Sequence, residues 1–324
     1  MTIERIDKLR VSILGATSHI AKGLIYFFSK HNEYELSLFA RTPSRVLVFA
    51  NSIGIAPPNV TRDLVSLSKS KCDVLINCIG IGDPGKLMSA IGDFFTVTER
   101  FDTFAIDYLL SNPKTLYINF SSGAAYCSDF NTPVDDATTS KIMINSIKPE
   151  HYYGITKLYG EIKHRALKEL NIVDLRIFGY FSRFIDLRSK YLITDVINAI
   201  NKREILQTSS IDIYRDYIHP SDLFQAIQMI ISKGHRNESY DIVSKSPISK
   251  FKLFEFFEKQ YGLQYQIVKT AGVQATGTKY YYYSVSNKLK KLGWKPNYTS
   301  AQVIKEESRE LLCRKSPRLL SRDG

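Results

Sequence analysis

Cysteine is scarce in this chain, and the few that are present form no ligand pattern. They stand at positions 72, 78, 127 and 313, and no Cys-x-x-Cys pair occurs among them. Structural zinc sites and disulfide frameworks normally show closely spaced cysteines. We therefore expect reduced, structural thiols, no metal site and a cytoplasmic location.

Long apolar runs are missing as well. No stretch approaches the roughly 20 consecutive apolar residues that a membrane-spanning helix needs. The segment MTIERIDKLR (1–10) lacks the apolar core of a secretion signal. Hydrophobic residues nevertheless make up 44% of the chain, which is typical of a globular protein with a buried core. The sequence thus predicts a globular protein with no membrane span.

Acidic residues are outnumbered by basic ones. The chain has 44 Lys and Arg against 32 Asp and Glu, a net charge of +12. A positive surface attracts anions, among which nucleic acid is the familiar partner. The basic residues are scattered, however, with the densest clusters in NKLKKLGWKP (287–296) and CRKSPRLLSRDG (313–324). No nucleic-acid-binding motif is present, so we expect no nucleic acid partner. A phosphorylated small molecule, or simply a basic solvated surface, explains the charge better.

Short apolar runs alternate with helical patterns over the first 180 residues. This alternation predicts a parallel sheet with crossover helices. The runs lack strict polar alternation, which is typical of strands covered on both faces. The predicted strands cover residues 10–15, 35–40, 73–79, 115–121, 173–179 and 239–244, and the predicted helices include 19–30, 93–111 and 150–170.

The fold class that follows is α/β, a doubly wound parallel Rossmann-type sheet with a smaller, interleaved C-terminal lobe. We expect residues 1–180 and about 221–244 to form the dinucleotide-binding domain. Residues of about 181–220, which look less regular, and 245–324 would form the substrate-binding lobe.

The segment VSILGATSHIAKG (11–23) has the layout strand, tight loop, helix. In this layout a helix N-terminus offers free N–H groups and a positive dipole end to a pyrophosphate. Gly15 begins the turn, but Ser18 and Ala21 occupy the places where a full dinucleotide fingerprint has further glycines. Ser18 is the larger departure, because a β-carbon penalises positive φ, although its hydroxyl could bond a phosphate. An ordinary βα turn is the alternative.

The second predicted strand ends in FARTPSR, which places Arg41 where a dinucleotide fold has the group that faces the adenosine ribose. A carboxylate at this place accepts bonds from a free 2′-hydroxyl, whereas an arginine pairs with a 2′-phosphate. Arg41 therefore favours NADP over NAD as the cofactor. An arginine that is merely solvated after the strand is the alternative.

Tyr153 and Lys157 stand four residues apart in HYYGITKLYGE (151–161) and so share a face of the predicted helix. A tyrosine hydroxyl titrates near about 10 and is a poor base at neutral pH, but an ammonium one turn away favours its phenolate form. The pair alone could equally be structural, because Tyr-x-x-x-Lys is common by chance. The apolar residues of the segment have the spacing of one buried helical face: Ile155, Leu158, Tyr159, Ile162, Ala166, Leu167 and Leu170.

Hydroxyl residues follow another predicted strand. The run TLYINF (115–120) continues as SSGAAY, so Ser121, Ser122 and Gly123 lie at its carboxyl end. Ligands of open α/β sheets bind at this edge. A serine there can hydrogen-bond the same substrate oxygen that a tyrosine protonates. The phosphate loop, the strand-end serine and the Tyr–Lys pair thus agree in order and spacing.

Taken together, these segments resemble the extended short-chain dehydrogenase/reductase family of nucleotide-sugar epimerases, dehydratases and reductases. The resemblance spans nearly the whole chain. It is carried by GATSHIA, DVLINCIG, SSGAAY, YYGITKLYGE, LRIFG, RDYIHPSDL, YDIVS and LGWKP. The combination is specific, although no single motif is.

The resemblance implies a role for each matching residue. Tyr153 would be the general acid/base, Lys157 would tune it and hold the nicotinamide ribose, and Ser122 would polarise the substrate oxygen. Arg215 would grip the diphosphate of a nucleotide sugar, and Gly123 would also line the substrate. For Arg215 the alternative is a surface ion pair with Asp212 or Asp216. The implied cofactor-binding residues are Gly15, Thr17, Ser18, His19, Ile20, Arg41, Asp63, Leu64, Cys78, Ile79, Gly80, Tyr153 and Lys157.

The resemblance also narrows the choice of reaction type. The family's dehydratases usually carry Asp-Glu after the hydroxyl residue, but Gly123 and Ala124 stand there, so elimination of water is unsupported. Arg41 favours NADPH-dependent reduction of a nucleotide-linked 4-keto sugar. The alternatives are a nucleotide-sugar 4-epimerase with tightly bound NAD and a non-catalytic dinucleotide-binding sensor. Many relatives form dimers, so by analogy we expect a homodimer.

Overall fold

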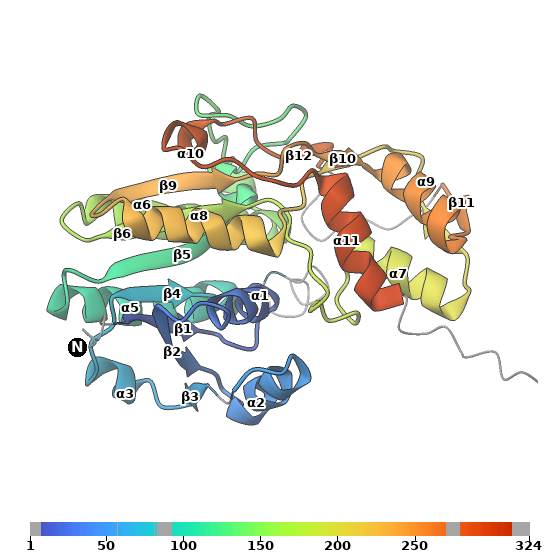
Figure 1. Cartoon of the computed structure of the whole chain (residues 1–324). Coiled ribbons are helices and arrows are strands. Elements are labelled where there is room, and N and C mark those ends of the chain that lie inside the picture. The colour runs from blue at the N-terminus through green and yellow to red at the C-terminus, as the bar shows by residue number, and fades with distance from the viewer. Residues whose placement is uncertain (1–7, 57, 81, 83–92, 270–278, 313–324) are drawn as a thin grey trace, which may run out of the picture.

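A seven-stranded sheet with helices on both faces forms the larger part of the molecule (Figure 1). The computed structural model describes residues 8–56, 58–80, 82, 93–269 and 279–312. The strand order is β3-β2-β1-β4-β5-β6-β9, and every neighbouring pair is parallel. The predicted α/β class and Rossmann-type sheet are therefore confirmed.

Six of the seven strands of this sheet nearly coincide with the predicted ones, and β3 was not predicted. All four residues of β4 are buried, as expected of a strand that helices cover on both faces. The strands are β1 (Leu9–Leu14), β2 (Tyr34–Phe39), β3 (Asn59–Thr61), β4 (Val74–Asn77), β5 (Leu116–Ser122), β6 (Ile172–Ile177) and β9 (Asn237–Ile242).

Helices cover the sheet in two layers. α1 packs beside α8 on one face, and α5 packs beside α6 on the other. The predicted helices 19–30, 93–111 and 150–170 are confirmed, although the last ends at Ala166. The helices around the sheet are α1 (His19–Phe28), α2 (Pro43–Ser52), α3 (Val65–Ser68), α5 (Asp93–Ser111), α6 (Pro149–Ala166), α8 (Pro220–Ser232) and α10 (Lys288–Lys291), with short 3-10 turns η1 (Gly123–Tyr126) and η2 (Ile144–Ser146).

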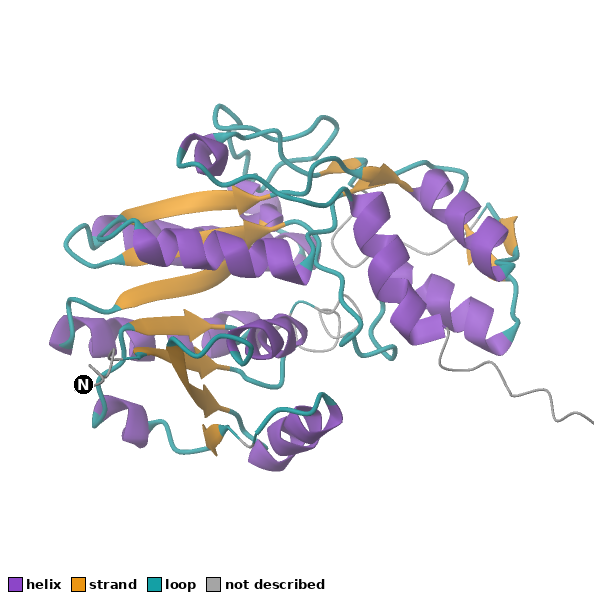
Figure 2. Ribbon diagram, viewed as in Figure 1, coloured by secondary structure: helices purple, strands orange, loops and turns teal. Residues whose placement is uncertain are grey.

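A second group of elements lies beyond the carboxyl ends of the strands (Figure 2). It has its own hydrophobic cluster, which includes Phe181, Val196, Phe254 and Ile304. We name this group the C-terminal lobe. Its elements are α7 (Leu192–Lys202), α9 (Lys250–Tyr261), α11 (Ser300–Leu312), the small sheet of β8 (Tyr214–Arg215), β10 (Ile248–Ser249) and β12 (Tyr281–Tyr282), and the pair β7 (Leu206–Thr208) and β11 (Tyr265–Ile267).

The expectation that residues of about 181–220 are less regular is wrong for the part that forms α7. Ile193, Val196 and Ile197 are buried at helical spacing, and this pattern was visible in the sequence. The exact division into two domains stays a prediction. Leu289 and Trp294, near the C-terminus, belong to the hydrophobic cluster of the large sheet.

The predicted buried face of α6 is also wrong. Tyr159 is 48% exposed and Ile162 is 60% exposed, whereas Glu161 and His164 are buried. The polar residues face inward because charged residues of α5 and β6 lie under the helix and pair with them. Glu161 pairs with Arg176 of β6 at 2.5 Å, and His164 lies between two aspartates. The apolar stripe of α6 is consequently left on the surface.

Two expectations from composition concern membrane-spanning helices and the state of the cysteines. Within the described part of the chain, no helix is long and apolar enough to cross a membrane. Cys72, Cys78 and Cys127 are free. Cys313 and the basic tail that follows it lie outside the described residues.

Candidate active site

The turn after β1 can only be made by glycine. Gly15 has a φ of +74°, and a β-carbon there would lie 2.9 Å from the Ile79 side chain and 3.0 Å from the Cys78 carbonyl. The N–H groups of Gly15 and Ala16 donate to the carbonyl of Phe39 at 2.9 and 3.0 Å. The turn is therefore held between the carboxyl ends of β2 and β4.

Ser18 and Ala21 replace the missing glycines without strain. Ser18 has a φ of −70°, so the expected penalty for positive φ does not arise there. Its hydroxyl caps α1 by accepting the Ala21 N–H at 3.2 Å, and Ala21 packs fully buried against the sheet. The first-turn amides of His19 and Ile20 lie at a helix N-terminus, where the helix itself offers them no acceptor. This end of α1 can therefore hold an anion.

The ring of His19 has a structural role. Its Nε2 lies 2.7 Å from the hydroxyl of Ser182, which follows β6. Burial lowers the pKa of His19 to about 3, so the ring is neutral and brings no charge to the loop. Thr17 is half-buried in the same loop. The His19 side chain is therefore turned away to Ser182, and the backbone of this loop is the part that can meet an anion.

Arg41 is exposed directly after β2 and Ala40. It stands beside the turn, because the Phe39 carbonyl two residues earlier accepts from Gly15. Its position agrees with the ribose side of a dinucleotide site. Contact with a 2′-phosphate stays a prediction.

Asp63 and Leu64 lie just past β3. The Asp63 carboxylate accepts the Val65 N–H at 2.9 Å, at the start of the short helix α3. Leu64 packs partly buried against the cluster under the sheet. Both residues are at the carboxyl edge of the sheet, and their implied contact with the cofactor also stays a prediction.

The segment Cys78–Gly80 bridges the turn and the Tyr–Lys helix. The Ile79 N–H donates to the Asn77 side chain at 3.0 Å, which fixes the chain where it leaves β4. A β-carbon on Gly80 would lie 3.7 Å from Nζ of Lys157. Gly15, Gly80 and Lys157 thus follow one another along the carboxyl edge of the sheet.

Lys157 is anchored to β5. Its Nζ donates to the carbonyl of Phe120 at 2.8 Å and lies 6.0 Å from the centroid of the Tyr153 ring. Tyr153 and Lys157 are one turn apart on α6, so their predicted shared face is confirmed.

α6 reaches the end of β5 through a close glycine contact. A β-carbon on Gly154 would lie 2.6 Å from the Ala124 carbonyl, so only glycine lets the helix pack this near to η1. Ser122 begins η1, is buried, and accepts the Ala124 N–H at 3.2 Å. A side chain on Gly123 would overlap the ring of Phe178, at 2.3 Å, so this position cannot supply an acid.

Tyr282 is a site residue that sequence reasoning missed. Its hydroxyl lies 3.0 Å from Oγ of Ser122. Burial raises the pKa of Tyr282, and the neighbouring Tyr153 raises it further. The structure therefore brings Ser122, Tyr153 and Tyr282 to one place, with Lys157 on the same helix as Tyr153. Nothing in the run KYYYYSV (279–285) shows from the sequence which tyrosine enters the site.

Arg215 stands in the small sheet of the C-terminal lobe, beside the site. It donates to the carbonyls of Tyr214 at 2.8 Å and Lys279 at 2.9 Å, and its guanidinium lies 5.9 Å from the Tyr282 ring centroid. Burial lowers the pKa of Arg215. Burial also lowers the pKa of Lys279 to about 8, and the charge of Arg215 adds to this effect. Two cations so placed make this wall of the site attractive to an anion.

The acids proposed as partners of Arg215 bond elsewhere. Asp212 accepts the Phe251 N–H at 3.2 Å. Asp216 accepts the Ser244 N–H and the Ser300 hydroxyl, each at 3.1 Å.

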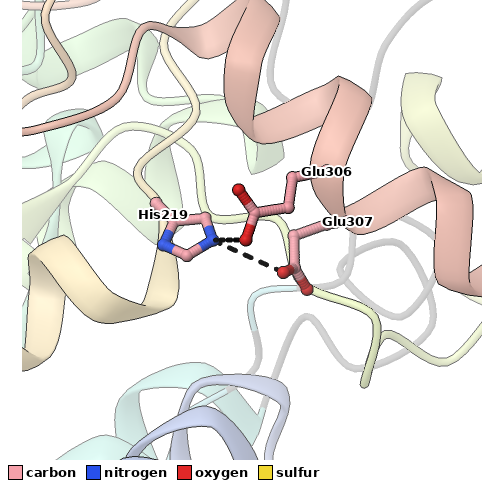
Figure 3. Close-up of side chains that lie close together, drawn as sticks. All are labelled: His219, Glu306 and Glu307. Carbon is pink, nitrogen blue, oxygen red and sulfur yellow. Dashed lines mark ion pairs between the residues drawn. The ribbon is translucent and has the colours of Figure 1, made fainter.

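A second polar cluster, at the start of α8, is shown in Figure 3. Nε2 of His219 lies 3.4 Å from Glu307 and 3.6 Å from Glu306, both on α11. Nδ1 accepts the Ser221 N–H at 3.1 Å and so caps α8. A neutral ring that accepts at Nδ1 carries its hydrogen on Nε2. That tautomer faces the carboxylates as a donor and leaves Nε2 no lone pair for a metal ion.

The arrangement at the sheet edge is that of a dinucleotide-binding α/β protein, with its glycine turn, its helix N-terminus and a lysine one turn after a tyrosine. Comparison with known proteins makes the assignment specific. The chain belongs to the NAD dependent epimerase/dehydratase family, whose model matches residues 11–243.

Individual relatives are distant. The dTDP-4-dehydro-6-deoxyglucose reductase of Escherichia coli is 25% identical over 206 residues, which are 62% of this chain and 65% of that protein. The match thus spans slightly less than two thirds of that relative's length.

Solved structures share the fold at lower identity. A UDP-N-acetylglucosamine 4-epimerase from Methanobrevibacter ruminantium, in complex with UDP-N-acetylmuramic acid, has a TM-score of 0.79 at 15% identity, covering 95% of this chain and 100% of that one. A dTDP-glucose 4,6-dehydratase from Bacillus anthracis, in complex with NAD, has a TM-score of 0.76 at 16% identity, covering 95% and 97%. These likenesses show the shared fold.

Proposed function

We propose that this protein is an NADPH-dependent reductase of a nucleotide-linked 4-keto sugar. The observation that carries the proposal is the grouping of Ser122 and Tyr153 at the carboxyl end of β5, with Lys157 anchored beside them. The residues around Gly15 fit a dinucleotide, because the turn presents backbone without a side chain and leads into a free helix N-terminus. A bound reduced nicotinamide supplies the hydride.

The chain's own residues handle the substrate oxygen. Ser122 would donate a hydrogen bond to the keto oxygen, and Tyr153 would give its proton to the same oxygen as it becomes an alcohol. The Lys157 ammonium lies where it can stabilise the phenolate that remains on Tyr153. Arg215 and Lys279 form a positive wall that suits the diphosphate of a nucleotide sugar.

Arg41 distinguishes the proposed reductase from the runner-up, a 4-epimerase with tightly bound NAD. An exposed arginine at the end of β2 offers a bidentate partner to a 2′-phosphate, which NADP has and NAD lacks. A reductase consumes cofactor stoichiometrically, whereas an epimerase regenerates it in every cycle. An assay that follows the consumption of reduced cofactor therefore separates the reductase from the epimerase.

A homodimer is part of the proposal. Phe95 on α5 and Tyr159 and Ile162 on α6 are 38%, 48% and 60% exposed, and the two helices pack side by side. Apolar side chains on adjacent helices form a surface that a second copy could cover. We also propose a cytoplasmic location, in keeping with the free Cys72, Cys78 and Cys127.

The test is absorbance at 340 nm with NADPH or NADH and a panel of nucleotide 4-keto sugars. We expect NADPH oxidation with one substrate, and Tyr153→Phe should lower kcat about 100-fold or more while cofactor binding is retained. Tyr152→Phe is the matched control, because this half-buried neighbour lies against Phe95 instead of the site. Undiminished turnover by the Tyr153 variant would remove the proton-donor assignment.

A further inference from the structure

We infer that Tyr282 is a positioning residue for Ser122. Its phenol donates a hydrogen bond to the serine oxygen and thereby directs the serine hydrogen towards the substrate oxygen. The inference rests on the proposed function, because it concerns the same substrate oxygen, and it adds a residue from the C-terminal lobe to the site.

The surroundings of Ser122 support this geometry. Oγ of Ser122 lies 3.0 Å from the hydroxyl of Tyr282 and accepts the Ala124 N–H at 3.2 Å. A hydroxyl oxygen has two acceptor lone pairs and one hydrogen to donate. When Tyr282 and Ala124 both donate, the two lone pairs are filled. The hydrogen of Ser122 is then the one hydrogen-bonding group that Ser122 can still offer, and it is available to a substrate oxygen.

The direction of the bond follows from acidity. A phenol is a stronger acid than an aliphatic alcohol and is therefore the better donor of the two. Burial, and secondarily the nearby Tyr153, raise the pKa of Tyr282, so its hydroxyl keeps its hydrogen at neutral pH. Tyr282 therefore has a hydrogen that it can donate to Ser122 at neutral pH.

The Tyr282 ring is held firmly enough to fix the direction of its hydroxyl towards Ser122. Its centroid lies 4.8 Å from that of Phe130 and 5.4 Å from that of Phe178. The Lys279 ammonium lies 4.6 Å from the same ring. The backbone is fixed as well, because the Tyr281 N–H donates to the Phe130 carbonyl at 2.9 Å. A donor that is already oriented needs no rearrangement during the reaction.

The experiment is a double-mutant cycle with Ser122→Ala, Tyr282→Phe and the combined variant. The substitution at Tyr282 removes the hydroxyl and keeps the ring. We expect Ser122→Ala to lower kcat on the order of 100-fold. Tyr282→Phe should lower kcat about tenfold with KM nearly unchanged, since the hydrogen bond strengthens only as charge develops on the substrate oxygen. The double variant should be no worse than Ser122→Ala, because Tyr282 acts through Ser122.

Tyr280→Phe is the matched control from the same run, because Tyr280 is 39% exposed, and it should leave kcat unchanged. The inference would be overturned if Tyr282→Phe left kcat normal or raised KM alone. It would also be overturned if the losses of kcat in the Tyr282 and Ser122 variants multiplied in the double variant. A faster variant would overturn it too, since it would mean that Tyr282 obstructs the substrate.

Urea unfolding of the same four proteins tests the bond without any substrate. Non-additive changes in the unfolding midpoint support a direct Ser122–Tyr282 bond, and additive changes refute it. If the wild-type protein turned over no nucleotide sugar, the proposed function and the positioning role of Tyr282 would fail together. The unfolding cycle would still decide whether the bond exists, so the two failures can be told apart.

Discussion

At the scale of single residues, backbone constraints and the exposed charge of Arg41 explain much of the loop around Gly15. Gly15 is required by both its φ of +74° and the close approach of Cys78 and Ile79. Ser18 shows that a lost glycine need not weaken the loop, because its hydroxyl caps α1. Arg41 has no comparable structural task among its described contacts, which leaves its charge available at the rim of the site.

Arg41 yields a prediction about cofactor choice. Arg41→Ala should weaken NADPH binding about tenfold or more and leave NADH binding nearly unchanged, because a charge-assisted bond to the 2′-phosphate is lost only with NADPH. Titration of the fluorescence of each reduced cofactor measures both affinities. Arg100→Ala, which removes an exposed arginine from α5, controls for the change in net charge. Equal losses for the two cofactors would remove the argument for NADP.

At the scale of elements, α6 is the unusual helix, because it buries charge and exposes apolar residues. His164 is fully buried, with Nδ1 2.9 Å from Asp174 of β6 and Nε2 2.8 Å from Asp102 of α5. Burial by itself would lower the pKa of His164, but the two carboxylates prevail and raise it to about 9. The imidazolium thus links three elements and fixes the helix that carries Tyr153.

The His164 linkage predicts a pH-dependent stability. Because the pKa of His164 is raised from 6.5 to about 9 on folding, its contribution is full below pH 6.5 and is lost as the pH rises through about 9. The free energy of unfolding of wild type should exceed that of His164→Gln by on the order of 3 kcal/mol at pH 6. We expect this difference to shrink towards pH 10.

Urea unfolding at several pH values measures the difference, and taking the variant as reference cancels the titrating groups that do not interact with His164. His151→Gln, an exposed histidine in the first turn of α6, should show no such trend. A difference that stayed constant from pH 6 to pH 10 would mean that His164 is neutral in the folded protein.

At the scale of the whole molecule, the site exists only where the C-terminal lobe meets the sheet. Ser122, Tyr153 and Lys157 come from β5 and α6, whereas Arg215 and Tyr282 come from the small sheet of the lobe. The Ser122–Tyr282 contact of 3.0 Å joins the two parts at the reacting position. The opposite end of α6 presents Tyr159 and Ile162 to solvent, on the surface proposed for a second copy.

The proposed dimer leads to a prediction at the same scale. Ile162→Lys should shift the protein from dimer to monomer, because a lysine cannot be buried in an apolar contact between two copies. Sedimentation velocity at micromolar concentration measures the change in mass. Val48→Lys is the control, since Val48 is 69% exposed on α2, away from this surface. A wild-type protein that sediments as a monomer would rule out the proposed interface.

The features that the sequence determined by itself are those written in local patterns. Apolar runs without alternation specified the buried parallel strands, and the order of Gly15, Ser122, Tyr153 and Lys157 placed the site at the carboxyl edge, because side-chain period and strand direction are local properties. The helical spacing of α7 was equally local and was overlooked.

Only the tertiary structure decided which face of α6 is buried and which tyrosine enters the site. Periodicity finds an apolar stripe in the sequence of α6. It cannot reveal that Asp102, Asp174 and Arg176 lie under the helix and pair with its polar residues. Likewise, four consecutive tyrosines look alike until long-range packing sets one hydroxyl against Ser122, 160 positions away in the chain. Such contacts depend on the partner surface, and that surface is encoded elsewhere in the sequence.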